Sequence, residues 1–106
     1  MIKAKVVKGK DDHIKEIYVS GHSGYNDLGK DIVCSAVSTA MYVSLGMLEK
    51  LNSDYRFTSD ESLPYMKLEV SKYNELTNLI LDNLVDTLEG IALDYQDFLK
   101  IEELRR

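Results

Sequence analysis

The longest regular pattern in this chain is a proline-free segment with apolar residues at helical spacing, from Ile32 to about Leu51. Asp31 directly precedes it, and Asp is a favoured N-cap because its side chain accepts hydrogen bonds from the free N–H groups of the first turn. If this segment is a helix that turns about 100° per residue, most of its surface is apolar. We therefore predict a mostly buried helix, whose remaining strip suits contact with another helix or subunit: Ser35, Thr39, Tyr42 and Gly46.

Strand-like segments lie on both sides of this predicted helix. Residues 2–8 and 14–20 alternate apolar and polar side chains around a turn of Gly, Lys and Asp, which predicts an antiparallel hairpin. Residues 54–58 and 65–70 predict a second hairpin, because a turn-forming Ser/Asp/Glu/Pro segment separates them. Residues 96–101 predict a short last strand before a charged tail.

A second helix is predicted from about Tyr73 to Asp94, since its apolar residues again recur at helical spacing. The side chains expected to face inward are Leu76, Ile80, Leu84, Leu88 and Ile91. Those expected to face outward are Glu75, Asn78, Asp82, Asp86 and Glu89. The resulting order ββαββαβ predicts one α+β domain over residues 1–106, in which two helices pack on one face of a mostly antiparallel sheet.

The net charge of the chain favours some classes of binding partner over others. The net charge of −5 and pI of about 4.9 oppose a phosphate-binding surface and favour a basic polypeptide partner, so direct nucleic-acid binding is not expected. We find neither a run of about 18 apolar residues nor a charged-then-apolar leader. We therefore expect no membrane span and a cytoplasmic location, where the single cysteine would remain a thiol.

That cysteine lies in the segment of the chain that is richest in reactive and turn-forming residues, residues 21–38. With Asp31 as N-cap, Cys34 occupies the third helical position, where free N–H groups and the helix dipole favour an anion and would lower the pKa of the thiol. His22 opens the preceding glycine-rich loop and is a candidate general base. The alternatives are a buried structural cysteine and a solvated loop histidine.

The neighbouring residues also allow two interpretations each. Asp31 either caps the helix or orients His22 as the third member of a triad. Ser38, one turn after Cys34, either hydrogen-bonds near the thiolate or bonds back to a helix carbonyl. Gly21 and the later glycines permit a bending loop or backbone donors facing a substrate. One cysteine and two histidines do not form a zinc site, so neither a metal nor another cofactor is expected.

The motif Gly21-His22-Ser23-Gly24-Tyr25, followed by Gly29-Lys30-Asp31-Ile32-Val33-Cys34 and Ser38, resembles the signature of the bacterial ribosomal-processing cysteine proteases. Chain length and element order also fit that family's domain. Ser35 stands where the family more often has Ala, and the C-terminal half carries no matching motif.

The resemblance implies a homodimeric Cys/His peptidase that removes a short N-terminal extension from a large-subunit ribosomal protein, cutting after aromatic residues. It implies Cys34 as the nucleophile and His22 as the base, with Gly21, Asp31 and Ser38 as supporting matches. We expect the oxyanion donors to be the Cys34 backbone N–H and an N–H of the glycine loop. A hydrophobic pocket near Cys34, involving Tyr25 and Met41, is expected to receive the aromatic residue.

Two other functions are compatible with the same residues. The first is a non-catalytic, ribosome-associated module in which the Gly/His/Cys segment is a binding loop and the acidic second helix contacts basic proteins. The second is a redox-sensing thiol protein, which the lack of a second, resolving cysteine disfavours. Full enclosure of Cys34, together with a His22 that points away from it even when the loop moves, would favour the binding module.

Overall fold

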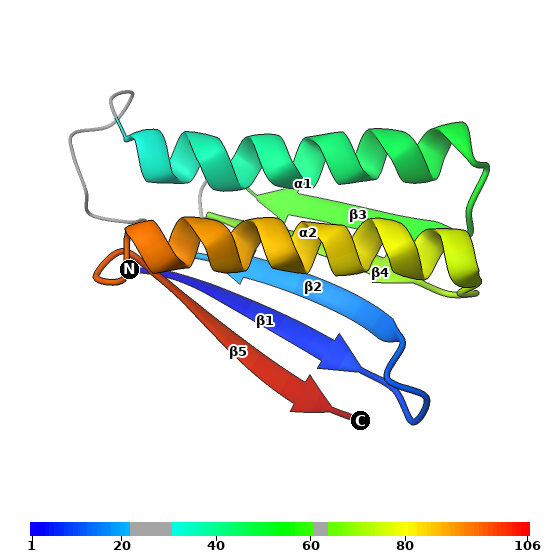
Figure 1. The fold of residues 1–106 in the computed structure, drawn as a ribbon. Coiled ribbons are helices and arrows are strands. Elements are labelled where there is room, and N and C mark those ends of the chain that lie inside the picture. The colour runs from blue at the N-terminus through cyan, green and yellow to red at the C-terminus, as the bar shows by residue number, and fades with distance from the viewer. Residues whose placement is uncertain (22–30, 61–63) are drawn as a thin grey trace.

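The computed structural model of the chain describes residues 1–21, 31–60 and 64–106. These ranges contain, in chain order, β1 (Ile2–Lys8), β2 (Ile14–Ser20), α1 (Ile32–Lys50), β3 (Tyr55–Asp60), β4 (Tyr65–Val70), α2 (Glu75–Asp94) and β5 (Leu99–Arg105). The predicted order ββαββαβ is confirmed. Both helices lie on the same face of the sheet, so the molecule has two layers (Figure 1).

The sheet follows the order β3-β4-β2-β1-β5. The two predicted hairpins pair antiparallel, with Val6 opposite Ile17 in the first and Phe57 opposite Leu68 in the second. Strands β2 and β4 also pair antiparallel and join the hairpins. The prediction of a mostly antiparallel sheet is therefore confirmed, and β3 and β5 are its two outer strands.

The last strand is displaced from its predicted position. Residues 95–98 form a turn, in which the Tyr95 carbonyl accepts the N–H groups of Phe98 and Leu99. Strand β5 starts after this turn and pairs in parallel with β1, from Ile2 opposite Leu99 to Lys8 opposite Arg105. The predicted charged tail is therefore strand, because an outer strand carries charged side chains without cost.

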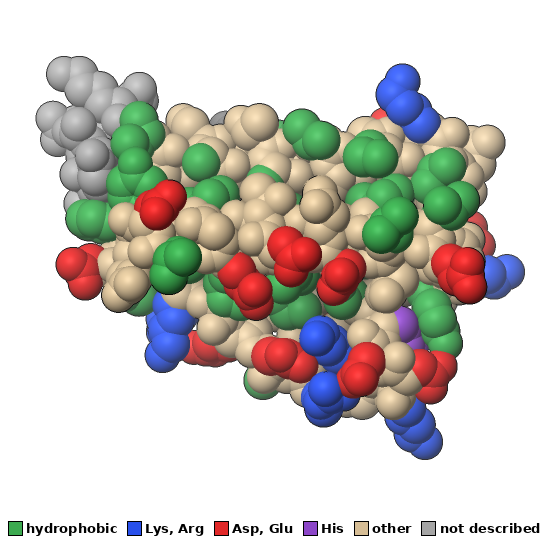
Figure 2. Space-filling model, in the orientation of Figure 1, with side chains coloured by type: hydrophobic (Ala, Val, Ile, Leu, Met, Phe, Trp, Pro, Cys, Tyr) green, Lys and Arg blue, Asp and Glu red, His purple; other side chains and the backbone are tan. Residues whose placement is uncertain are grey.

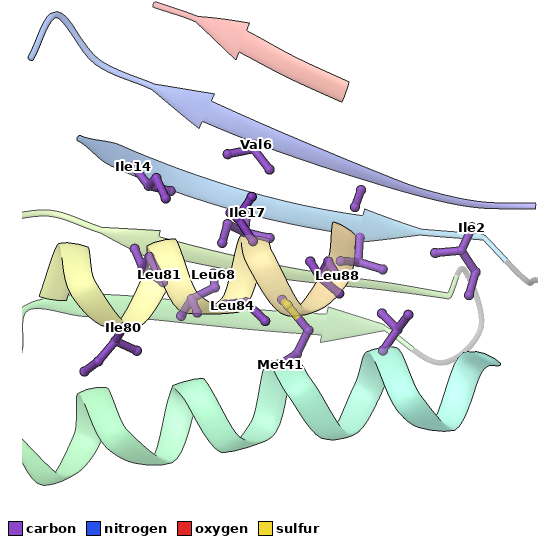
Figure 3. Close-up of a cluster of buried hydrophobic side chains, with 14 of the residues drawn as sticks. Ile2, Val6, Ile14, Ile17, Met41, Leu68, Ile80, Leu81, Leu84 and Leu88 are labelled. Carbon is purple, nitrogen blue, oxygen red and sulfur yellow. The ribbon is translucent and has the colours of Figure 1, made fainter. Parts of the chain in front are cut away.

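A single hydrophobic core fills the space between the sheet and the helices. Figure 3 shows side chains that contribute to it from both layers: Ile17 and Leu68 from the sheet, Met41 from α1, and Leu81, Leu84 and Leu88 from α2. Each of these side chains is fully or almost fully buried. A buried side chain of this size contributes about 1.5–3 kcal/mol to folding, so this layer contact dominates the stability of the domain.

The helix α1 has the predicted bounds to within one residue, but the prediction that it is mostly buried is wrong. Its buried positions form one stripe: Val33, Val37, Met41, Ser44 and Leu48. The large apolar side chains on its outer face are half exposed, as at Val43 (58%) and Met47 (50%). Leu51, the predicted end of the helix, is its C-cap and is 44% exposed. A helix on a two-layer domain has only one face to bury, whatever its composition.

By length and composition α1 could also cross a membrane, contrary to the expectation that no segment could. Its mean hydropathy reaches 1.5 over 18 residues, because apolar and small residues stand on the outer face where an exposed helix usually carries charged ones. In this structure the helix lies flat on the sheet and contributes its buried stripe to the core (Figure 1). A core helix of a soluble protein passes the same test of length and hydropathy.

The helix α2 begins at Glu75, two residues after the predicted start. Asn74 and Thr77 form a reciprocal capping box, which buries Thr77 at 1% exposure. Leu76, predicted to face inward, is 56% exposed, because each four-residue step turns about 40° around the helix and so leaves it at the side of the buried stripe. Asn78, predicted to face outward, is half-buried, and its Oδ1 accepts the Ile14 N–H at 2.9 Å. The remaining inward positions follow the prediction, with Ile91 only half-buried.

Candidate active site

The start of α1 has the geometry predicted for it. Asp31 has extended backbone angles and caps the helix, its Oδ1 accepting the N–H groups of Val33 and Cys34 at 3.0 Å each. Helix α1 begins at Ile32, so Cys34 is its third residue. The sequence Asp31-Ile32-Val33-Cys34 thus fixes the cysteine backbone relative to a carboxylate.

This cap changes the expected oxyanion donors. The Cys34 N–H already donates to Asp31 Oδ1, so it is not available to a substrate oxygen while the cap is in place. The Gly21 N–H donates to the Pro64 carbonyl at 3.0 Å. The later glycines of the loop, Gly24 and Gly29, lie outside the described residues.

The Cys34 side chain is half-buried rather than enclosed. At about 100° per residue, Cys34, Ser38 and Tyr42 follow one another along one flank of α1. That flank faces the outer strand β3, because the Tyr42 ring packs on the Phe57 ring with centroids 5.8 Å apart. Ser38 is also half-buried. The thiol therefore lies on the side of α1 that faces the sheet edge.

His22 and Tyr25 lie outside the described residues, so their placement relative to Cys34 is not part of the described geometry. The residues that flank them are described. Strand β2 ends and α1 begins toward the same end of the molecule (Figure 1). Gly21 and Asp31 therefore both belong to the end of the domain at which Cys34 lies.

Gly21 has a backbone reason to be glycine. Its φ is +92°, and a Cβ there would lie 2.6 Å from the carbonyl oxygen of Met1. Side chains are strained at such a φ, and a carbonyl of the adjacent strand cannot move away easily. The structure thus gives Gly21 a role in ending β2, independent of any contact with a substrate.

The predicted specificity pocket is only partly compatible with the structure. Met41 is 0% exposed and belongs to the core, so the prediction that it lines an open pocket is wrong. Tyr42 and Phe57 lie beside the thiol-bearing flank instead, and sequence reasoning missed both for this role. The four-residue spacing of Cys34, Ser38 and Tyr42 was a usable signal, whereas the partner Phe57 required knowledge of the sheet order.

A groove of about 560 Å³ lies on the other flank of α1, between α1 and α2. Apolar side chains line most of it, among them Ile32, Ala36, Ala40 and Val43, and the polar Asn83 and Thr87 contribute from α2. Figure 2 shows hydrophobic side chains gathered over the helices on this face, and acidic side chains along one border. The groove and the thiol therefore open on different sides of the helix.

Within residues 1–21, 31–60 and 64–106, no three His, Cys, Asp or Glu side chains converge in a way that would hold a metal ion. The chemistry available among the described residues is that of a half-exposed thiol at a capped helix start.

Fold and site together define a class: a two-layer α+β domain that presents a thiol at the start of its first helix. The sequence model of one family, described as cysteine protease Prp, matches residues 1–100. The chain belongs to this family of ribosomal processing cysteine proteases.

Individual relatives agree with this assignment. The ribosomal processing cysteine protease Prp of Staphylococcus aureus is 21% identical over 103 residues, covering 95% of this chain and 97% of the relative. Its Bacillus subtilis counterpart is 22% identical over 107 residues, with coverages of 95% and 96%.

Solved structures show the same fold. The S. aureus protease Prp in complex with a covalently linked product peptide superposes with a TM-score of 0.91 at 20% identity, covering 97% of this chain and 99% of that one. SMU.848 from Streptococcus mutans superposes with a TM-score of 0.87 at 26% identity, covering 100% and 96%.

Proposed function

We propose that this protein is a cysteine endopeptidase that removes the N-terminal extension of a large-subunit ribosomal protein, with Cys34 as nucleophile and His22 as general base and acid. Membership of a family of ribosomal processing cysteine proteases supports the reaction class. The observation that carries the proposal is Cys34, half-exposed at the third position of a helix whose start Asp31 caps.

In the proposed reaction, His22 takes the proton of the Cys34 thiol, and the thiolate attacks the carbonyl carbon of the scissile bond. The imidazolium then protonates the leaving amine, which departs with the C-terminal product and leaves a thioester on Cys34. His22 next removes a proton from water, which attacks the thioester. Collapse of this intermediate releases the N-terminal extension as a carboxylic acid and returns the thiol.

The supporting residues have separate proposed roles. Asp31 positions Cys34 through the hydrogen bond to its N–H, and Gly21 fixes the chain direction immediately before His22. Ser38 lies one helical turn from Cys34 on the same flank, within the surface that a substrate would contact. With the Cys34 N–H engaged by Asp31, the oxyanion donor is proposed to come from the glycine loop.

We propose that the enzyme is a homodimer in the cytoplasm, where its ribosomal substrate is made. The exposed apolar side chains of α1 and the groove beside α2 are the surface proposed for the second copy. Small residues at Ser35, Ala36 and Ala40 allow close approach of a helix, and this surface opens away from the thiol. Binding there leaves Cys34 accessible.

The test is mass spectrometry of a ribosomal precursor incubated with the wild-type protein, Cys34→Ala, His22→Ala and, as a matched control, Ser35→Ala. We expect the wild type and Ser35→Ala to release the extension, because Ser35 lies on the exposed groove side of α1. The two other variants should fold and leave the precursor intact. Normal turnover by Cys34→Ala would contradict the mechanism.

The non-catalytic binding module gains no support from the structure. Its distinguishing expectation was an enclosed Cys34 with His22 pointing away; the Cys34 side chain is half-buried, and His22 lies outside the described residues. A precursor that binds the wild-type protein without being cut would nevertheless favour it in the same experiment.

A further inference from the structure

The outer strand β3 lies beside the thiol-bearing flank of α1. Within the part of the chain that the structure describes, it is the end of the sheet and pairs with β4 alone. The unpaired edge of such a strand presents main-chain donors and acceptors that another extended chain can use.

The hydrogen-bond pattern identifies these residues. The Ser71 N–H donates to the Asp54 carbonyl at 2.9 Å, one step beyond the pair of Tyr55 with Val70. Because hydrogen-bonded and non-bonded pairs alternate in antiparallel strands, Arg56 and Thr58 also turn their main-chain groups toward β4. The intervening residues, Tyr55, Phe57 and Ser59, turn theirs outward.

These outward groups are open on the described part of the molecule. Outside the β3–β4 ladder, no backbone hydrogen bond between helices, strands, turns and loops in residues 1–21, 31–60 and 64–106 uses the N–H or carbonyl of Tyr55, Phe57 or Ser59. Their side chains face the helix layer, as the contact of Phe57 with Tyr42 shows. An added strand would therefore have free main-chain partners on one side and aromatic rings above it.

The unpaired edge of β3 extends toward the end of the molecule at which the Cys34 thiol lies. Strand β3 runs beneath α1 toward the start of that helix (Figure 1). Cys34 precedes Tyr42 by two helical turns, about 12 Å. Asp60 follows Phe57 by about 10 Å of strand. A chain that lies along β3 and continues past Asp60 therefore arrives at the level of Cys34.

We propose that the edge of β3 binds the substrate main chain as an added strand, through the outward N–H and carbonyl groups of Tyr55, Phe57 and Ser59. This inference rests on the proposed peptidase function and assigns it a substrate-binding surface. The occupant is the apolar, extended segment on one side of the scissile bond. Alternate side chains of that segment contact Tyr42 and Phe57, and the others face away from the helices.

A second copy of the chain is the other conceivable occupant of a strand edge. The position of the edge argues against it, since a folded partner there would lie over the flank that carries Cys34 and Ser38. A single extended peptide covers the edge and still brings a carbonyl to the thiol.

The first test uses wild-type protein and a series of substrate peptides, each with one backbone N–H replaced by N–CH3. An added strand bonds through alternate residues, so every second replacement should raise KM about five- to ten-fold, and the intervening ones much less. A series without alternation, on peptides that are still cleaved, would overturn this binding mode and leave the proposed function standing. Absence of cleavage of the unmodified peptide would instead contradict the proposed function.

The second test changes the edge itself. Ser59→Pro removes an outward N–H without breaking a bond to β4, and proline is tolerated at such an edge position. We expect KM to rise about five-fold with kcat little changed, whereas the control Thr58→Ala, an exposed position whose main-chain groups face β4, should match the wild type. Equal KM values in both variants would overturn the proposal, as would a change in oligomeric state without a change in KM. Should Ser59→Pro fail to fold, the peptide series decides alone.

Discussion

Asp31 joins the fold to the proposed chemistry, because one carboxylate oxygen both caps α1 and holds the Cys34 N–H. Asp31→Ala should lower the free energy of unfolding by about 0.5–2 kcal/mol and reduce kcat as Cys34 loses its fixed position. Asp31→Asn should restore both, since Asn is also a good N-cap. Urea unfolding and peptide cleavage measure the two effects. If the Asn variant were folded and stable but as slow as the Ala variant, the cap would not be what positions Cys34 for catalysis. The negative charge of Asp31 would then have a separate role.

Gly21 offers a test of backbone strain beside the site. Gly21→Ala should destabilise the protein by about 1–3 kcal/mol, because the new Cβ meets the Met1 carbonyl at a φ that Ala rarely adopts. Gly90→Ala is the matched control, since its Cβ would meet nothing within 4 Å. The control should gain up to about 1 kcal/mol from helix propensity. Equal unfolding midpoints would show that Gly21 is not strained.

Of the site, the sequence was enough to predict the cap, the helix start and the helical position of Cys34, because each depends on a few neighbouring residues. The engagement of the Cys34 N–H by Asp31 was not predicted, although it follows from the same cap. The proximity of Phe57 depends on the sheet order, which local patterns do not contain.

For the helices and strands too, neighbouring residues determine some of the boundaries, and contacts with distant segments determine others. Strands β1, β2 and β4 and helix α1 begin and end close to their predicted residues, since periodicity and turn residues mark them. The position of Leu76 was mispredicted because residues spaced by four drift around the helix, and Leu76 lies at the side of the stripe that α2 buries. Strand β5 was misplaced because its register comes from pairing with β1.

The turn between β1 and β2 is tied to β5 by an ion pair between Asp12 and Arg105. The hydrogen bond and charge of the guanidinium lower the pKa of the Asp12 carboxyl below its ordinary value of 3.8. A lowered pKa in the folded state means that the ion pair stabilises the protein above that value and is lost as pH falls below it. As pH falls through this range, the free energy of unfolding of Asp12→Asn should therefore decrease less than that of the wild type. The difference should be small because both side chains are exposed. An identical acid profile would show that the pair contributes nothing.

The arrangement of the whole molecule separates two surfaces, with the thiol and the β3 edge on one flank of α1 and the apolar groove on the other. If a second copy covers the groove, Val43→Asp should convert a dimer into a monomer, because it places a charge in an apolar contact. Analytical ultracentrifugation measures this, with Thr58→Asp, exposed on β3, as the control. A wild-type monomer at micromolar concentration would contradict the proposed homodimer.

The acidic side chains of α2 form a second feature of the whole molecule. Asp82, Asp86 and Glu89 are exposed on one face, and the chain has a net charge of −5 (Figure 2). A basic precursor should therefore associate more slowly as salt rises, since exposed charges are screened beyond about 8–10 Å. Neutralising Asp82 and Asp86 to Asn should flatten the salt dependence of kcat/KM. No change in rate or salt slope would mean that this face is only solvated surface.

Covalent catalysis by Cys34 is tested most directly by acid-quenched mass spectrometry of the protein during turnover of a peptide ester. An ester forms the acyl-enzyme faster than a peptide bond does, so the thioester should accumulate. We predict a mass increase equal to the N-terminal acyl segment, located on Cys34 by peptide mapping and absent from Cys34→Ala. Ester cleavage by Cys34→Ala at the wild-type rate, with no adduct on the wild-type protein, would contradict the account.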